Sequence, residues 1–113
     1  MSNKPDKLFS LLGLASKARQ VVSGEVATEN AVKSGKAWLV IVPTDASENT
    51  VKKFKNMCEF RDIPFYRYGT KDTLGHAMGK EERSSVAVTG RGFAEGILKQ
   101  FEVIGSNENG GNC

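Results

Sequence analysis

The sequence has few of the residues that catalytic and metal-binding sites require. Its 113 residues include one histidine, His76, and two cysteines, Cys58 and Cys113. Because metal sites need clustered ligands and the two cysteines are far apart in the chain, we expect no metal and no other cofactor. A structural disulfide between the two is not expected either. No cysteine or carboxylate pair near His76 is typical of a catalytic triad, so the sequence predicts a protein that is not an enzyme.

Long apolar runs are also missing. No segment approaches the roughly 20 residues that span a bilayer, and the N-terminal MSNKPDK has no apolar stretch of signal-peptide type. We therefore expect a cytoplasmic protein with no membrane partner. A hydrophobic content of 39% with 26% charged residues predicts one globular domain. Its expected span is residues 1–104, followed by a flexible tail rich in Gly and Asn at residues 105–113.

The small positive charge is concentrated near the N-terminus. The net charge is +3, and residues 1–36 hold six basic and three acidic side chains, which is the whole excess. This distribution favours an anionic partner for the N-terminal third. Solvated helix faces explain the same charges without any partner.

Helical and strand-like patterns alternate along the chain. Helices are expected at residues 6–19 and 24–35, from residue 45 onward, and at 70–79 and 92–101. Strands are expected at residues 37–43 and 84–90, a loop with a short strand at 62–69, and a brief strand or a bend at 20–24. The run AWLVIVP at 37–43 is continuously apolar, as in a central strand that is buried on both faces. This alternation predicts an α/β fold: a three-layer α/β/α sandwich with a small mixed four-stranded sheet.

Local signals predict how two of the helices begin and end. Gly35 is expected to end the second helix in a left-handed conformation. Asp45 is expected to cap the third helix, with Glu48 returning the second hydrogen bond of a capping box. The lysines of that helix are expected to face water: Lys52, Lys53 and Lys55.

Two glycine-containing motifs resemble nucleotide-binding loops, but their context is wrong for that function. TGRGFAEG follows a strand and opens a helix, yet its glycine spacing is off by one and no second strand follows it. GKEERSS has leucine, Leu74, where a Walker loop has its first glycine. We therefore expect no nucleotide hydrolysis and no small-molecule substrate.

Two polar segments bounded by glycine remain as candidate sites. One is the start of the helix after Gly24, whose only apolar side chains before Gly35 are Val26, Ala27, Ala31 and Val32. The other is the loop at residues 80–85. Free N–H groups at a helix start bind anions, and Gly24 lets a phosphate or a base edge approach the backbone.

Several motifs occur in a characteristic order within residues 7–102. These are KARQVVSG, AVKSGKAWLVIVPTDAS, DIPFYRYGTKDTLGHAMGK and SSVAV. The Leu74-Gly75-x-Ala77-x-Gly79 pattern and the apolar strand that runs into PTDAS are the most specific. Their order and spacing resemble the kink-turn RNA-binding family of ribosomal proteins L7Ae and L30e. LLGLASKAR, DASENT and GFA are most similar to its small bacterial YlxQ branch. The resemblance implies an α/β/α sandwich that binds RNA, is ribosomal or ribosome-associated, and has no enzymatic activity.

The resemblance also implies where RNA would bind. The helix after Gly24 would enter the widened groove of a kinked RNA beside sheared G·A pairs, and the loop at 80–85 would cover the bulge bases. The partner would be a ribosomal or other structured RNA, bound by a monomer. The candidate RNA-binding residues are Gly24, Glu25, Val26, Ala27, Asn30, Lys33, Lys36, Lys17, Arg19, Asp45, Lys80, Glu82, Arg83 and Ser84.

Three of these positions depart from the family pattern. Val26, Ala27 and Asn30 stand where the family usually has Asn or Lys, then Glu or Gln, and then Lys. Contact through the backbone and RNA shape, with phosphates bound by flanking lysines, is then the expected mode. The alternative is a protein-interaction module on the same fold that has lost specific RNA binding, for which the apolar Val26–Ala27 surface is suited.

Overall fold

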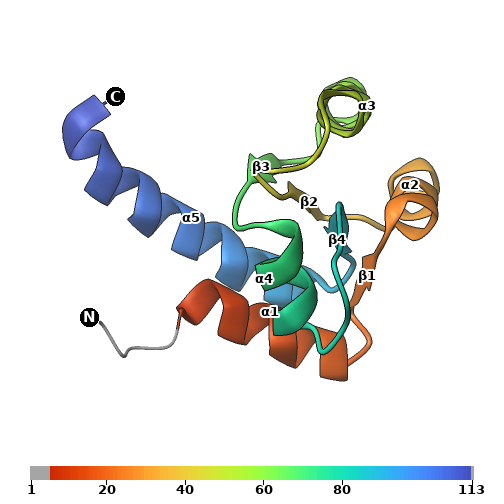
Figure 1. The fold of residues 1–113 in the computed structure, drawn as a ribbon, viewed down its shortest axis with the longest axis horizontal. Helices are drawn as coiled ribbons and strands as arrows, with labels where there is room; N and C mark the ends of the chain where they lie inside the picture. Colours follow the sequence, from red (N-terminus) through yellow and green to blue (C-terminus); the bar gives the residue numbers. More distant parts are fainter. Residues whose placement is uncertain (1–5, 113) are drawn as a thin grey trace.

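The computed structural model describes the backbone of residues 6–112 and the side chains of residues 6–104. Helices and strands alternate in this part of the chain, as the sequence predicts (Figure 1). The elements are α1 (Lys7–Lys17), β1 (Val21–Ser23), α2 (Glu25–Lys33), β2 (Leu39–Val42), α3 (Glu48–Arg61), β3 (Phe65–Arg67), α4 (Lys71–Ala77), β4 (Val86–Val88) and α5 (Arg91–Asn112).

The four strands form one mixed sheet in the order β1-β4-β2-β3. Strand β4 is antiparallel to both of its neighbours, with Val22 opposite Ala87 on one side and Val40 opposite Ala87 on the other. Strands β2 and β3 are parallel, as expected for two strands joined through a helix. All four residues of β2 are buried, which confirms the prediction of a central strand.

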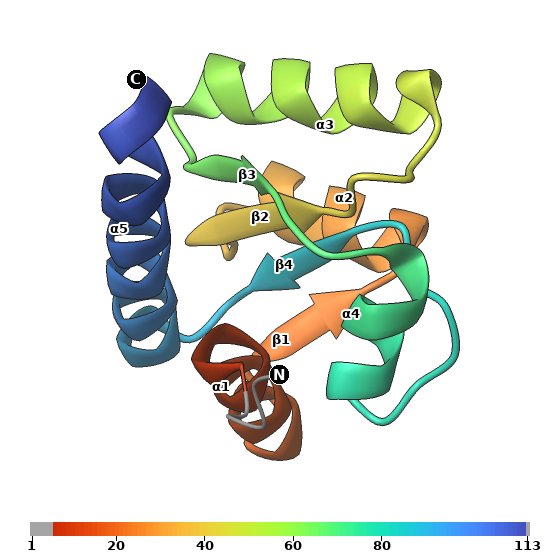
Figure 2. The same cartoon turned by 60° about the vertical axis from the view of Figure 1, so that its left-hand side comes forward.

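Helices cover both faces of this sheet, so the predicted three-layer α/β/α sandwich is confirmed (Figure 2). Alternate residues of a strand point to opposite faces, and β2 divides in this way between two apolar clusters. Leu39 and Ile41 pack with α1, α4 and α5. Val40 and Val42 pack with α2 and α3, where Phe54 and Cys58 are fully buried.

The start of α3 differs from the prediction. Ser47 is the N-cap, and its side chain accepts a hydrogen bond from the Thr50 N–H at 3.2 Å. Asp45 lies too early in the chain to cap a helix whose first residue is Glu48. Its carboxylate instead accepts the N–H of Lys71 at 2.8 Å, at the start of α4. The predicted capping box at Asp45 and Glu48 is therefore wrong.

The end of α2 follows the prediction, since Gly35 has a φ of +77°. The helix α5 extends to Asn112 and so includes most of the segment that was predicted as a tail. The side chains of residues 105–113 lie outside the described part, so flexibility there and the domain boundary at residue 104 stay predictions. In the described part of the chain, no helix is both long enough and apolar enough to cross a membrane.

Candidate nucleic-acid interface

The two candidate segments meet at one end of the sheet, where β1 ends and β4 begins. The N–H of Gly24 donates to the carbonyl of Ser85 at 2.9 Å and continues the β1–β4 pairing by one residue. One helical turn later, the Ser85 hydroxyl donates to the Thr28 hydroxyl at 3.1 Å. Both side chains are fully buried. These two contacts fix the start of α2 against the end of the loop that precedes β4.

Gly24 is the N-cap of α2, with φ +94° and ψ 157°, a conformation that essentially only glycine adopts. It has no side chain to cap the helix, and the first hydrogen bond of the helix runs from the Thr28 N–H to the Gly24 carbonyl. The N–H groups of Glu25, Val26 and Ala27 therefore have no acceptor within the helix. Val26 is 73% exposed, so this helix start is open to solvent.

The loop between α4 and β4 is held by backbone contacts and by one arginine. The Lys80 N–H donates to the Gly75 carbonyl at 2.8 Å, which turns the loop back across α4. The Nε of Arg83 donates to the Ser23 hydroxyl at 3.0 Å, and the Arg83 N–H donates to the Lys71 carbonyl at 3.0 Å. Lys71 in turn donates its N–H to Asp45. The loop thus connects the end of β1 with the start of α4.

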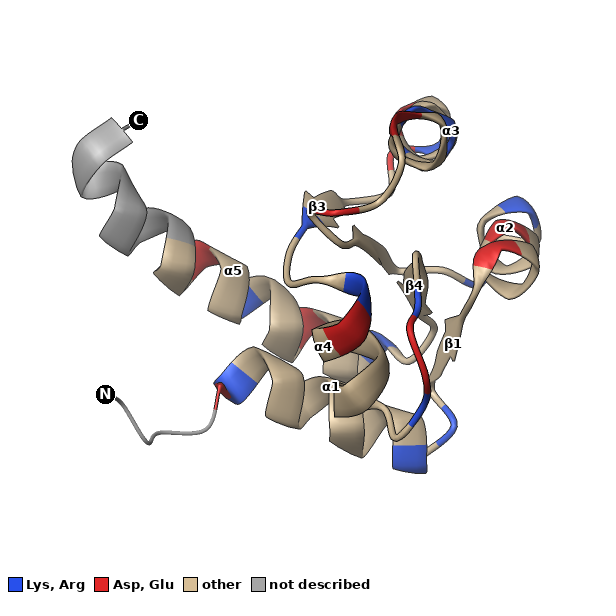
Figure 3. Ribbon diagram, viewed as in Figure 1, with Lys and Arg blue, Asp and Glu red and all other residues tan. Residues whose placement is uncertain are grey.

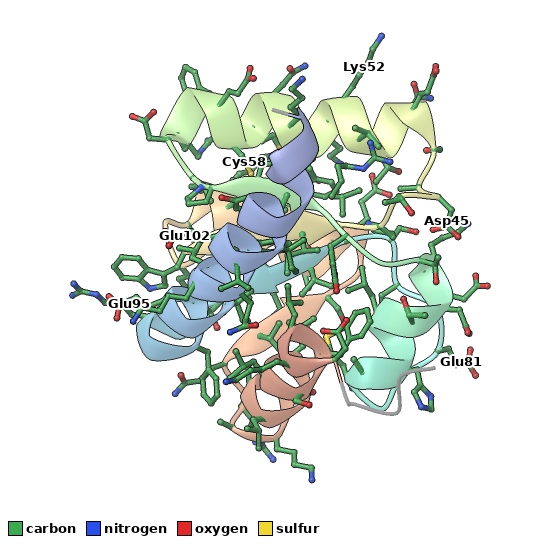
Figure 4. The ribbon with its side chains drawn as sticks, turned by 90° about the vertical axis from the view of Figure 1, so that its left-hand side faces the viewer. Asp45, Lys52, Cys58, Glu81, Glu95 and Glu102 are labelled. Carbon is green, nitrogen blue, oxygen red and sulfur yellow. The ribbon has the colours of Figure 1, made fainter. Side chains whose placement is uncertain are left out.

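The exposed side chains of this loop carry both signs of charge. Lys80, Glu81 and Glu82 are exposed, whereas Arg83 and Ser84 are half-buried. Figure 3 shows the two acidic residues lying between the basic ones along the loop. Glu81 and Asp45 lie on the same side of the molecule, at the right of Figure 4. With one guanidinium nitrogen bound to Ser23, Arg83 positions the loop as well as contributing charge.

A shallow groove brings three other candidates together along α2. Ala27, Asn30 and Lys36 line it, together with Val22 on β1 and Thr89 after β4. Asn30 and Lys36 are exposed. The groove runs from the first turn of α2 past its C-terminal end, so a ligand at the helix start could extend along one side of the helix, over a mixed apolar and polar lining.

Charged side chains on the other side of α2 form a continuous chain of ion pairs, here called the α2–α3 network. The Lys33 ammonium pairs with Glu29 at 2.8 Å, and the Lys53 ammonium pairs with Glu29 at 2.7 Å and Glu25 at 2.8 Å. Lys53 belongs to α3, and its side chain is only 33% exposed. Lys52 and Lys55 are exposed as predicted, whereas Lys53 is half-buried at the junction of the two helices.

The network changes the pKa values of Glu29 and Lys53. Hydrogen bonds from Lys33 and then Lys53 lower the pKa of Glu29 from 4.5 to about 2. Hydrogen bonds to Glu25 and Glu29 raise the pKa of Lys53 above its ordinary value. Glu29 and Lys53 are therefore held in their charged forms at neutral pH.

Glu29→Gln is expected to lose stability at neutral pH relative to the wild type, and this difference should disappear in acid. The folded pKa of Glu29 lies below the unfolded one, so its pairing stabilises the fold above pH 4.5 and is lost as the pH falls to about 2. Urea unfolding across this range measures the effect. Glu81→Gln, which removes an exposed carboxylate without an ion pair in the described part of the chain, is the control and should show no such convergence.

Two candidates lie apart from the start of α2. Arg19 is exposed in the turn before β1, so the length of β1 separates it from Gly24. Lys17 lies in the last turn of α1, in a groove shared with Met78 and Gly79 at the end of α4. Arg19 therefore lies next to the end of α1 in the chain, and Lys17 lies beside the end of α4. Neither belongs to the α2 helix start.

The described residues show little that could support other chemistry. No three His, Cys, Asp or Glu side chains within residues 6–104 gather closely enough to hold a metal ion. Cys58 is a free thiol in the core, and burial raises its pKa to about 11. A thiol with that pKa stays protonated at neutral pH and is a poor nucleophile.

Sequence reasoning missed Thr28, Lys53 and the inward position of Ser85. Glu29 and Lys33 have the i, i+4 spacing of a helical ion pair, which the sequence alone could have predicted. Lys53 offers no comparable signal, because its partners lie 24 and 28 residues away on another helix. The hydroxyl pair is equally non-local.

Comparisons with known proteins agree with this architecture. Residues 6–97 match the model of the ribosomal protein L7Ae/L30e/S12e/Gadd45 family. The chain is 42% identical over 94 residues to the RNA-binding protein YlxQ of Bacillus subtilis (strain 168), which covers 83% of this chain and 94% of that protein. It is 33% identical over 96 residues to the RNA-binding protein YlxQ of Enterococcus faecium, covering 85% and 92% of the two chains.

Two solved structures are similar as well. A protein with unknown function from Bacillus halodurans C has a TM-score of 0.84 at 38% identity, over 87% of this chain and 99% of that one. The Giardia lamblia 15.5kD RNA binding protein has a TM-score of 0.72 at 20% identity, over 88% and 92% of the two chains. At that identity the second similarity concerns the fold alone.

Proposed function

This chain belongs to the ribosomal protein L7Ae/L30e/S12e/Gadd45 family, in its YlxQ-like branch, and we propose that it is a non-enzymatic RNA-binding protein that recognises kinked RNA. The observation that carries the proposal is the pairing of Gly24 with Ser85. It places an uncapped helix start beside a polar loop, which gives two neighbouring surfaces for one bent RNA. Two relatives in the same branch bear the name RNA-binding protein.

Recognition would depend on backbone groups and RNA shape. Val26 and Ala27 have no polar side-chain atoms, so the N–H groups of the first turn of α2 are the available donors for a phosphate or a base edge. Asn30 and Lys36 would contact the RNA where it runs along the groove beside α2. Shape and unpaired bases are the features by which proteins distinguish one structured RNA from another.

The cellular setting is part of the same proposal. We place the protein in the cytoplasm, as a monomer associated with ribosomal or other structured RNA. The candidate RNA-binding residues remain those around Gly24 and the loop at 80–85. Lys17 and Arg19 would then contact a more distant part of the backbone.

A binding titration tests the proposal. The affinity of the full chain is measured for a kink-turn RNA and for a plain duplex of equal length, each at two salt concentrations. Binding to the kinked RNA should be at least ten-fold tighter, about 1.4 kcal/mol, and should weaken as salt rises. Equal and weak binding to both RNAs would contradict recognition of the kink.

Charge reversal locates the surface in the same assay. Lys33→Glu combined with Lys36→Glu places two negative charges at and just after the C-terminal end of α2. It should weaken binding to the kinked RNA by more than ten-fold. Lys52→Glu with Lys55→Glu, on the exposed side of α3, is the matched control and should have a smaller effect. An unchanged affinity for the first pair would mean that the RNA lies elsewhere.

One observation favours the alternative function. Val26 is a large apolar side chain with 73% exposure, at a position where an RNA contact would favour a polar group. A protein-interaction module would use this side chain as an apolar anchor. If the titration shows no RNA binding, and Val26→Asp leaves the fold intact, this second function becomes the better account.

A further inference from the structure

The α2–α3 network places a lysine from another helix beside the first turn of α2. Lys53 pairs with Glu25, which is the first residue of α2 and one of the residues with a free N–H group. The described residues of α2 up to Asn30 include no lysine or arginine. A cation is therefore present beside the helix start, but it comes from α3.

In the free protein this cation is neutralised by the helix it approaches. The four members alternate in sign along the junction of α2 and α3, in the order Lys33, Glu29, Lys53, Glu25, and their net charge is zero. Glu25 is 57% exposed and Lys33 is 58% exposed, so both ends of the network are in contact with water. The Lys53–Glu25 pair is exposed on its Glu25 side and contributes little to stability, so exchanging Glu25 for another partner is easy.

We infer that the α2–α3 network is a charge gate on RNA binding, in which an RNA phosphate replaces Glu25 as the partner of Lys53. Lys53 is then a cationic phosphate ligand beside the helix start, and Glu25 is the internal competitor that limits affinity. The inference rests on the proposed function, since it assigns an RNA phosphate to Lys53 at the same RNA interface.

Electrostatics explain why an RNA phosphate would displace Glu25 as the partner of Lys53. An RNA backbone presents several phosphates at once and releases counterions when cations bind it, whereas Glu25 offers one carboxylate. Moving the Lys53 ammonium away from Glu25 leaves it near Glu29, so it does not become unpaired. Glu25 is on the surface and can turn into solvent.

The test is a double-mutant cycle on the full chain, with the kink-turn RNA as the probe. Lys53→Met removes the charge but keeps a straight side chain that favours helix, and it should weaken binding about threefold to fivefold and reduce the salt slope by about 0.7 to 0.9. Glu25→Gln releases Lys53 and should strengthen binding about threefold. In the Lys53→Met background, that gain should fall by at least half.

Lys52→Met is the matched control, because Lys52 is the preceding residue of the same helix and points away from the protein (Figure 4). It removes the same formal charge, so it measures the general electrostatic loss. It should weaken binding by less than twofold, and the gain from Glu25→Gln should persist in its background. Circular dichroism and thermal melting of each variant show whether the fold is intact at the temperature of the titration.

Three results decide the inference. If the wild type prefers the kinked RNA but Lys53→Met binds as well as Lys52→Met does, the network only joins two helices and the charge gate is wrong, while the proposed function stands. If Glu25→Gln gives the same gain with and without Lys53, the carboxylate acts by simple repulsion and the gate is again wrong. If the wild type binds neither RNA, the proposed function and the gate fail together.

Discussion

Replacing Gly75 with alanine should lower the free energy of unfolding by about 3 kcal/mol, at the upper end of the range for overpacking a buried site. A Cβ at this buried position would lie 1.9 Å from the carbonyl oxygen of Glu81 and 2.6 Å from its carbonyl carbon. Both are backbone atoms, so no side-chain rotation relieves the contact. Either α4 or the loop after it has to move.

The same substitution should weaken RNA binding. The hydrogen bond from the Lys80 N–H to the Gly75 carbonyl holds the loop close to α4, and displacement of the loop would disturb it. We expect a loss of at least ten-fold for the kink-turn RNA, measured below the melting temperature of the variant. Amide exchange at Lys80 should accelerate, because its acceptor moves.

Gly92→Ala is the matched control. A Cβ at Gly92, in the first turn of α5, would meet no atom within 4 Å. Alanine is the better helix former, so this variant should be as stable as the wild type or more stable by up to about 1 kcal/mol. If urea unfolding gave similar stabilities for the two variants, the close approach at Gly75 would not be needed for the fold.

Ser85→Ala should cost about 2 kcal/mol of stability, because it leaves the hydroxyl of Thr28 buried without its partner. A buried polar group that loses its hydrogen bond retains the full penalty of its desolvation. The neighbouring Ser84 is half-buried, and its side chain makes no hydrogen bond within the described part of the chain. Ser84→Ala should therefore change stability by less than about 0.5 kcal/mol.

The double variant separates a lost hydrogen bond from lost packing. Thr28→Val exchanges one hydroxyl for a methyl group, and Ser85→Ala deletes the other. In the combined variant neither hydroxyl remains to be left unpaired. It should be more stable than Ser85→Ala alone by about 1 kcal/mol or more. Strictly additive losses in urea unfolding would show that the two hydroxyls do not depend on each other.

The sequence predicted the fold well because the relevant signals are local. The continuous apolar run at 37–43 indicated a strand covered on both faces, and β2 is buried throughout. The cap of α3 was predicted less well, since Asp45 and Ser47 are both good capping residues a short distance apart. The choice between them depends on Lys71, in a distant part of the chain, whose backbone N–H donates to the Asp45 carboxylate.

The candidate site was predictable in its outline and less so in its contacts. Glycine at position 24 and the polar loop at 80–85 are visible in the sequence, and the fold brings them together. What the sequence could not show is that Lys53 reaches α2, since only tertiary packing places α3 beside it. It also could not show that Arg83 is bound to Ser23.

The order of the strands has a consequence for how the chain folds as it is made. The last strand in the sequence, β4, lies between β1 and β2, so the sheet is divided until residues 86–88 are available. A nascent chain that ends before β4 has β2 and β3 but cannot connect them to β1. The closure of the loop between residues 23 and 86 is a late, non-local step. Folding of this sheet is therefore coupled to synthesis of the chain through β4, and the start of α2 is joined to its partner loop only in that step.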